Sequence, residues 1–259
     1  MNQQTVNLSY DTYGKGIPIL LIHGFPLNRS IWDAVIPSLS ENALVIVPDL
    51  RGFGKSPVRK DGYSMDIFAE DILDFLNRLG IEKIAIAGHS MGGYVALAVA
   101  RKARERLSGL GLVCSRVGAD SPERRESRYL LAARVLAEGA QVIGEGMPAQ
   151  LSHRIEIQER IREIIQDTEP EVIAGALIAM AERPDQTDLL ADLNVPVLFI
   201  AGSDDLLSPP ALNQQMHAAI PGSLYFEISG AGHMPMMEAP AETSRALRYW
   251  IDVISANWG

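Results

Sequence analysis

Residues 84–100 read IAIAGHSMGGYVALAVA, an apolar run followed by a serine between glycines and then by an alanine-rich stretch. This pattern predicts a strand, a sharp turn and a helix. In such a turn the serine adopts a strained backbone conformation that exposes its hydroxyl at the carboxyl end of the strand, and the small residues two places on either side let strand and helix approach closely. Ser90 is therefore predicted to be a nucleophile.

Uninterrupted apolar runs of strand length recur on both sides of this motif. They lie at 17–22, 43–47, 81–87, 107–113 and 195–201. Because apolar and polar residues do not alternate in them, the runs indicate parallel strands that are covered on both faces. Helical patterns separate most of the runs, and together they predict an α/β fold with a mostly parallel, doubly wound sheet.

The stretch from about Arg116 to Leu190 interrupts this alternation, since it has helical periodicity and no convincing strand. We expect an inserted helical cap over the carboxyl edge of the sheet. The chain then divides into a first part of the core (1–115), a cap (116–192) and a second part of the core (193–259). The charged segment at 123–128, Glu-Arg-Arg-Glu-Ser-Arg, is predicted to be a solvated helix face.

The composition narrows the classes of partner. With 32 acidic and 23 basic residues the net charge is −9, and no basic stripe could follow a phosphate backbone, so no nucleic-acid partner is expected. The first five residues lack the features of a secretion signal and no apolar run has membrane-spanning length, so we expect a cytoplasmic protein without a membrane partner. The oligomeric state is left open.

Cys114 is the single cysteine, which excludes a disulfide within the chain and a metal cage built from cysteines and histidines. It ends the apolar run 107–113 and is predicted to be a small buried hydrophobe.

Partners for a serine nucleophile follow later strands. The loop after 195–201 carries Asp204 and Asp205, and His233 follows a further candidate strand. A serine hydroxyl needs a base that accepts its proton and an acid that orients that base. His233 is the candidate base, and either aspartate could fix its tautomer. The order Ser90, aspartate, histidine differs from the order in the two best-known serine protease folds.

Backbone donors for an oxyanion are expected in residues 23–26, His-Gly-Phe-Pro, which follow the strand 17–22 and reach the same edge of the sheet. Pro26 disfavours the α region for Phe25, so the Phe25 N–H is predicted to lie on extended backbone facing the serine. The N–H of Met91 would lie beside it, at a helix start that favours an anion. No metal or organic cofactor is required for this chemistry.

Apolar side chains near these motifs are candidates for an acyl or alcohol pocket. They are Phe25, Trp32, Met91, Met234, Met236 and Met237. Phe25 and Met91 are the strongest of them, because their backbones are already implicated.

Jointly these motifs resemble the α/β-hydrolase superfamily, of the capped esterase, lactonase and non-haem haloperoxidase type. The resemblance rests on residues 23–27, 49–56, 88–93 and 230–233. In that family the acid usually lies three residues after a glycine and four before a proline, which implies Asp205.

The resemblance implies a catalytic triad of Ser90, Asp205 and His233 with an oxyanion hole at Phe25 and Met91, and no cofactor. The implied function is cleavage of a small-molecule carboxylic ester or lactone through an acyl-serine intermediate. Relatives that open epoxides or remove halides use an aspartate in place of Ser90, so those reactions are not expected. A carbon–carbon bond hydrolase with the same triad, and a ligand-sensing regulator of the same fold, remain open alternatives.

Overall fold

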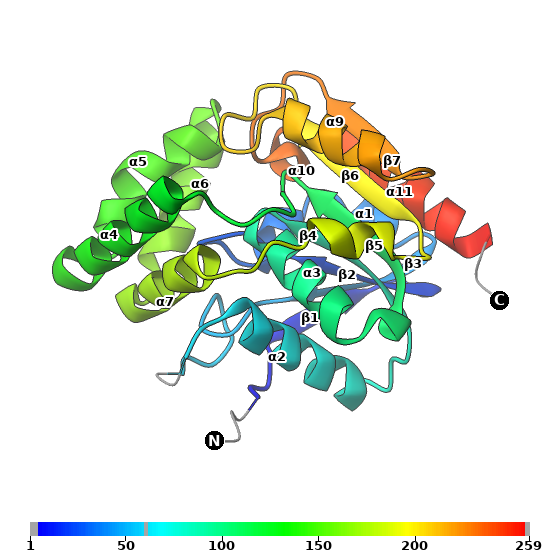
Figure 1. Cartoon of the computed structure of the whole chain (residues 1–259), viewed down its shortest axis with the longest axis horizontal. Coiled ribbons are helices and arrows are strands. Elements are labelled where there is room, and N and C mark those ends of the chain that lie inside the picture. Colours follow the sequence, from blue (N-terminus) through cyan, green and yellow to red (C-terminus); the bar gives the residue numbers. More distant parts are fainter. Residues whose placement is uncertain (1–4, 60–61, 257–259) are drawn as a thin grey trace.

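One sheet of seven strands organises the computed structural model, which describes residues 5–59 and 62–256. In this part of the chain the strands are β1 (Tyr10–Tyr13), β2 (Ile17–Ile22), β3 (Ala43–Pro48), β4 (Ile84–His89), β5 (Leu107–Val113), β6 (Val197–Gly202) and β7 (Leu224–Ile228). Their order is β1-β3-β2-β4-β5-β6-β7, and every neighbouring pair is parallel except β1 with β3. The predicted α/β fold with a mostly parallel sheet is confirmed (Figure 1).

Helices cover both faces of this sheet, as β5 illustrates. A Cβ at Gly93 in α3 (Met91–Lys102) would lie 3.2 Å from the Leu112 side chain, whereas a Cβ at its neighbour Gly111 would lie 3.6 Å from Trp250 in α11 (Pro240–Ala256). Successive residues of a strand point to opposite faces, so an uninterrupted apolar run is what two covered faces require. The other core helices of the described residues are η1 (Arg29–Trp32), α1 (Ile36–Leu39), α2 (Met65–Arg78), η2 (Arg104–Arg106), α9 (Pro210–Ala219) and α10 (Pro235–Glu238).

One predicted strand begins too early, and one strand of the sheet is missing from the predictions. The apolar run 81–87 predicts a strand from Ile81, but β4 begins at Ile84, because the Ile81 N–H donates to Leu76 O (3.0 Å) and closes the end of α2. The strand β1 was not predicted. It is a short edge strand with mostly exposed side chains, so it has no apolar run in the sequence.

The segment predicted to be a cap contains helices joined by loops and no strand among its described residues. It contains α4 (Pro122–Glu138), α5 (Gln141–Leu151), α6 (Ile155–Gln166), α7 (Pro170–Ala181) and α8 (Thr187–Ala191). The helices α4 and α7 pack along one another, as do α5 and α6, and the four gather at one side of the sheet (Figure 1). We call α4–α7 the cap. Its limits at 116 and 192 as a separate unit stay a prediction.

No helix in the described part of the chain is both long enough and apolar enough to cross a lipid bilayer.

Candidate active site

Ser90 lies on the sharp turn between β4 and α3. Its backbone has φ 50° and ψ −113°, a conformation that residues with a side chain rarely adopt. Hydrogen bonds on both sides hold it there, since the Ser90 N–H donates to Val113 O (2.9 Å) and the Ser90 carbonyl accepts from Gly93 N–H (3.0 Å) and Ser115 Oγ (2.7 Å). The strained turn directs the Ser90 hydroxyl toward a cavity at the carboxyl ends of the strands.

Glycines two places from the serine permit this turn. A Cβ at Gly88 would lie 2.2 Å from the carbonyl carbon of Gly92, and a Cβ at Gly92 would lie 2.4 Å from Ile22 O. Both neighbours are backbone atoms and cannot rotate away. Only glycine fits at either position without moving β2 or α3.

His233 and Asp205 are joined by a hydrogen bond between Nδ1 and Oδ2 of 2.8 Å, and both side chains are buried. The other carboxylate oxygen of Asp205 accepts the N–H groups of Leu207 and Ser208, each at 2.9 Å. Asp204 is exposed and accepts from the Ser203 hydroxyl instead. Of the two candidate acids, Asp205 is therefore the one that contacts the imidazole.

Electrostatics keep Asp205 ionised. Burial raises the pKa of its carboxyl, but the charge and hydrogen bond of His233 and the N–H groups of Ser208 and Leu207 lower it more, so the pKa lies below its usual range. An ionised carboxylate on Nδ1 orients the imidazole so that Nε2 is free to accept a proton.

Two further histidines surround the site and are held neutral. His89 packs against His233 with ring centroids 5.0 Å apart, and its Nε2 donates to the His233 carbonyl (2.8 Å). Burial, and next the charge of His233, lower the pKa of His89 to about 3. His23 accepts the Leu50 N–H at Nε2 (2.9 Å), so its Nδ1 carries the proton and donates to Gly24 O (2.9 Å).

The candidate oxyanion donors come from two turns. Phe25 and Pro26 are the central residues of a turn with a cis peptide bond between them, closed by the Leu27 N–H donating to Gly24 O (3.0 Å). The extended backbone expected at Phe25 stays a prediction, and the cis-proline turn is a feature that the sequence did not reveal. Met91 is the first residue of α3, so its N–H is one that the helix itself does not engage.

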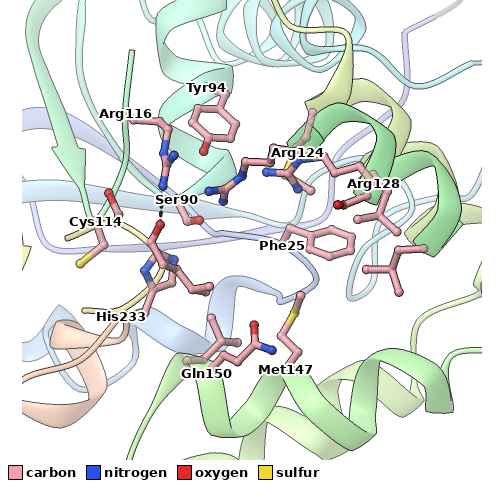
Figure 2. Close-up of a pocket in the computed structure, with 17 residues that line it drawn as sticks. Phe25, Ser90, Tyr94, Cys114, Arg116, Arg124, Arg128, Met147, Gln150 and His233 are labelled. Atoms are coloured by element: carbon pink, nitrogen blue, oxygen red, sulfur yellow. Dashed lines mark hydrogen bonds between the residues drawn. The ribbon is translucent and has the colours of Figure 1, made fainter. Parts of the chain in front are cut away.

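A cavity of about 260 Å³ lies between these loops and the cap. Figure 2 shows Ser90 and His233 on one side of it, with Met147 and Gln150 of α5 facing them across the space. Most of its apolar wall comes from the cap. These side chains are Leu131, Met147, Leu151, Leu177 and Met180.

The pocket predictions are only partly right. Phe25 lines the cavity, but the side chains of Trp32, Met91, Met234, Met236 and Met237 are not among its described lining residues. Trp32, Met91, Met234 and Met236 are buried in the core instead. Sequence reasoning missed the cap side chains, because periodicity predicts a helix without saying which helix it faces.

The prediction of a solvated face at 123–128 is also partly wrong. Arg125 and Glu126 are exposed as expected, but Arg124 and Arg128 are half-buried and line the cavity. Their spacing of four residues places both guanidinium groups on one side of α4. This spacing in the sequence could have indicated that the two arginines share one face of the helix, whereas the charges alone indicated only a solvated surface.

Hydrogen bonds join the loop that carries His233 to the cap. The His233 N–H donates to Leu151 O at the end of α5 (3.0 Å). Glu238 accepts the Gly232 N–H (2.6 Å) with one carboxylate oxygen and the hydroxyl of Ser152 with the other. The position of the candidate base therefore depends on where α5 ends.

Cys114 is buried as predicted, but it lies beside the site as well as in the core. Its sulfur, Asp205 and His233 offer ligand atoms within 4.8 Å of one another. A metal would need a thiolate, and burial, followed by the charge of Asp205, raises the pKa of the Cys114 thiol well above its usual range. Asp205 and His233 already share a hydrogen bond, so these donors fit a proton-transfer pair better than a metal site.

Comparisons with known proteins agree with the fold. The sequence model of the family described as the alpha/beta hydrolase fold matches residues 17–240. The structure of a thermophilic esterase from Thermogutta terrifontis, malate bound, is 43% identical with a TM-score of 0.93, and the match covers 96% of this chain and 94% of that one.

Two more distant relatives act on ester bonds according to their names. The pimeloyl-[acyl-carrier protein] methyl ester esterase of Aeromonas hydrophila is 27% identical over 262 residues, which cover 95% of this chain and 100% of that protein. The enol-lactonase of Burkholderia xenovorans LB400 shares the fold, with 24% identity, a TM-score of 0.87, and coverage of 95% of this chain and 97% of that one. The resemblance seen in the sequence is thus confirmed, and the chain belongs to the alpha/beta hydrolase family, among relatives that include esterases.

Proposed function

We propose that the protein is a serine hydrolase that cleaves a carboxylic ester or lactone through an acyl-serine intermediate. The observation that carries the proposal is that Ser90, on its strained turn, opens into the same cavity as His233, whose Nδ1 is held by Asp205. The family and the names of the esterase relatives support an ester bond rather than a carbon–carbon bond.

In the acylation step, His233 Nε2 accepts the Ser90 proton while Ser90 Oγ attacks the carbonyl carbon. The N–H groups of Phe25 and Met91 stabilise the negative oxygen that forms. The carbon–oxygen bond to the alcohol then breaks, and His233 returns the proton to the departing oxygen. Asp205 stabilises the imidazolium between these transfers.

In the second step, water attacks the acyl-serine. His233 takes a proton from the water and gives it to Ser90 as the acid is released, so the enzyme returns to its starting state. For a lactone the alcohol stays tethered to the product. Neither step calls for a metal or an organic cofactor, so a chelator is expected to leave turnover unchanged.

Replacement of Ser90 tests the mechanism. We expect Ser90→Ala to fold normally and to lose turnover of 4-nitrophenyl esters by several orders of magnitude, the scale seen when a triad member is removed. A fluorophosphonate probe should label the wild type at Ser90 and leave the variant unlabelled. Thermal unfolding serves as the control for folding. Turnover at the wild-type rate in the variant would exclude an acyl-serine.

A further inference from the structure

The cavity beside Ser90 is cationic in a chain whose net charge is −9. Arg116, Arg124 and Arg128 line it, and no aspartate or glutamate is among its described lining residues. Figure 2 shows the guanidinium groups gathered near Tyr94, on the side of the cavity away from α5. Placing three positive charges against an apolar wall costs solvation free energy, so each one requires an explanation.

One buried carboxylate accounts for part of this charge. Asp120 pairs with Arg128 Nε at 2.5 Å and with Arg183 Nη2 at 2.9 Å. Arg183 also lies over the Tyr94 ring, 4.0 Å from its centroid. These contacts join the start of α4 to the segment that follows α7, so Arg128 and Arg183 both have an ion-pair partner within the structure.

Arg124 and Arg116 are not explained in the same way. The ion pair between Arg124 Nε and Asp120 is 3.4 Å long, and Asp120 is already engaged by two closer guanidinium groups. Arg116 Nη2 donates to Leu207 O, and its Nε is a buried donor without an acceptor in the described residues. Burial, and next the positive charge of Arg116, lower the pKa of Arg124 below its usual range.

We infer that the substrate carries a carboxylate, which Arg124 of α4 binds together with Arg116. The ester or lactone carbonyl of the same substrate lies at Ser90. A guanidinium group presents two parallel N–H donors that match the two oxygens of a carboxylate. The apolar wall of the cavity, which includes Phe25 and the cap side chains, fits the hydrocarbon that separates the two groups of such a substrate. This inference rests on the proposed hydrolase function and specifies its substrate class.

Two pairs of esters test the inference. In each pair one member has a free carboxylate, and in the other member a methyl ester masks that carboxylate. The first pair is mono-4-nitrophenyl adipate and its methyl ester, which places the carboxylate on the acyl side. The second is 4-acetoxybenzoate and its methyl ester, which places it on the alcohol side. In one of the pairs we expect the wild type to prefer the acid by about tenfold or more in kcat/KM, the value of a hydrogen bond to a charged group. High salt should reduce that preference, since Arg124 is partly exposed.

Variants assign the preference to a residue. Arg124→Gln should bring the ratio of acid to methyl ester close to one, and Arg124→Lys should restore part of it. Arg134→Gln is the matched control, because Arg134 lies on the same helix, is exposed and pairs with Glu138. That variant should keep the wild-type ratio, although its change in net charge is the same.

The outcomes separate this inference from the proposed function. If the wild type hydrolyses the methyl esters and is labelled at Ser90 but prefers the acid in neither pair, the inference is wrong and the hydrolase function stands. A preference that survives in a folded Arg124→Gln variant removes Arg124 from the site. If none of the four esters is turned over and the probe labels nothing, the proposed function fails and takes the inference with it.

Discussion

Two neighbouring aspartates follow β6, and their surroundings differ. Asp205 is buried on the His233 ring, whereas Asp204 is exposed to solvent. An asparagine at the acid keeps its shape but removes its charge and favours the wrong imidazole tautomer. We therefore expect Asp205→Asn to lose turnover of 4-nitrophenyl butyrate by about 10⁴-fold, with Asp204→Asn staying within about tenfold of the wild type. The opposite ranking would assign the acid to Asp204.

His89 makes stability depend on pH. In the unfolded chain a histidine gains its proton below about pH 6.5, whereas the folded state holds the pKa of His89 at about 3. Between these values the unfolded state binds more protons, so stability falls as pH falls, by about 1.4 kcal/mol per pH unit from this residue. His89→Gln keeps a donor for the His233 carbonyl and removes the titration. Thermal unfolding at pH 7 and pH 5 should show a smaller loss in the variant, and equal losses would contradict this account.

Some residues of the candidate site can be predicted from the sequence, and others cannot. Ser90 is predictable because the turn that exposes it needs only local sequence, a strand, small residues and a helix. The choice of Asp205 over Asp204 needed the spacing of a known family, since both are equally acidic and adjacent. Arg124 escaped prediction because a charged residue on a surface helix and one over a cavity have the same local pattern.

The contact between α3 and the end of β2 can be tested through a glycine. A Cβ at Gly92 would lie 2.4 Å from Ile22 O and 2.6 Å from His23 O, so Gly92→Ala must displace the turn that carries Phe25. We expect the free energy of unfolding, measured with urea, to fall by about 1–3 kcal/mol. Turnover should fall as well. Gly146→Ala is the control, because it lies inside α5 with open space around it. It should gain about 0.5–1 kcal/mol, and similar losses in both variants would rule out the steric explanation.

Helices and strands are predicted well from the sequence where their side chains are buried, and poorly where they are exposed. The core strands are found because two covered faces demand long apolar runs. The edge strand β1 carries no such requirement, since only its backbone pairs with β3. The cap helices are recognisable as helices, but their packing partners depend on contacts between segments distant in the sequence, such as α4 with α7.

Across the whole molecule, the cap and the core meet at the cavity, so the structure divides the proposed tasks between them. Strand ends of the core supply Ser90 and His233, and the cap supplies most of the apolar wall. A change in the apolar part of the substrate is therefore expected to require changes mainly in the cap. The turns of the core can remain as they are.

The His233 amide donates a hydrogen bond to the Leu151 carbonyl at the end of α5, so exchange of this amide proton reports motion of the cap. Its proton can exchange with deuterium from the solvent only when α5 moves away from the loop or the loop itself opens. We expect Glu238→Gln, which weakens the second link between loop and cap, to speed exchange at His233 while leaving the central strand β4 protected. Exchange at His233 as slow as in β4, in both proteins, would mean that the cap opens only when the whole molecule unfolds. Substrate would then have to enter through a cap that stays closed.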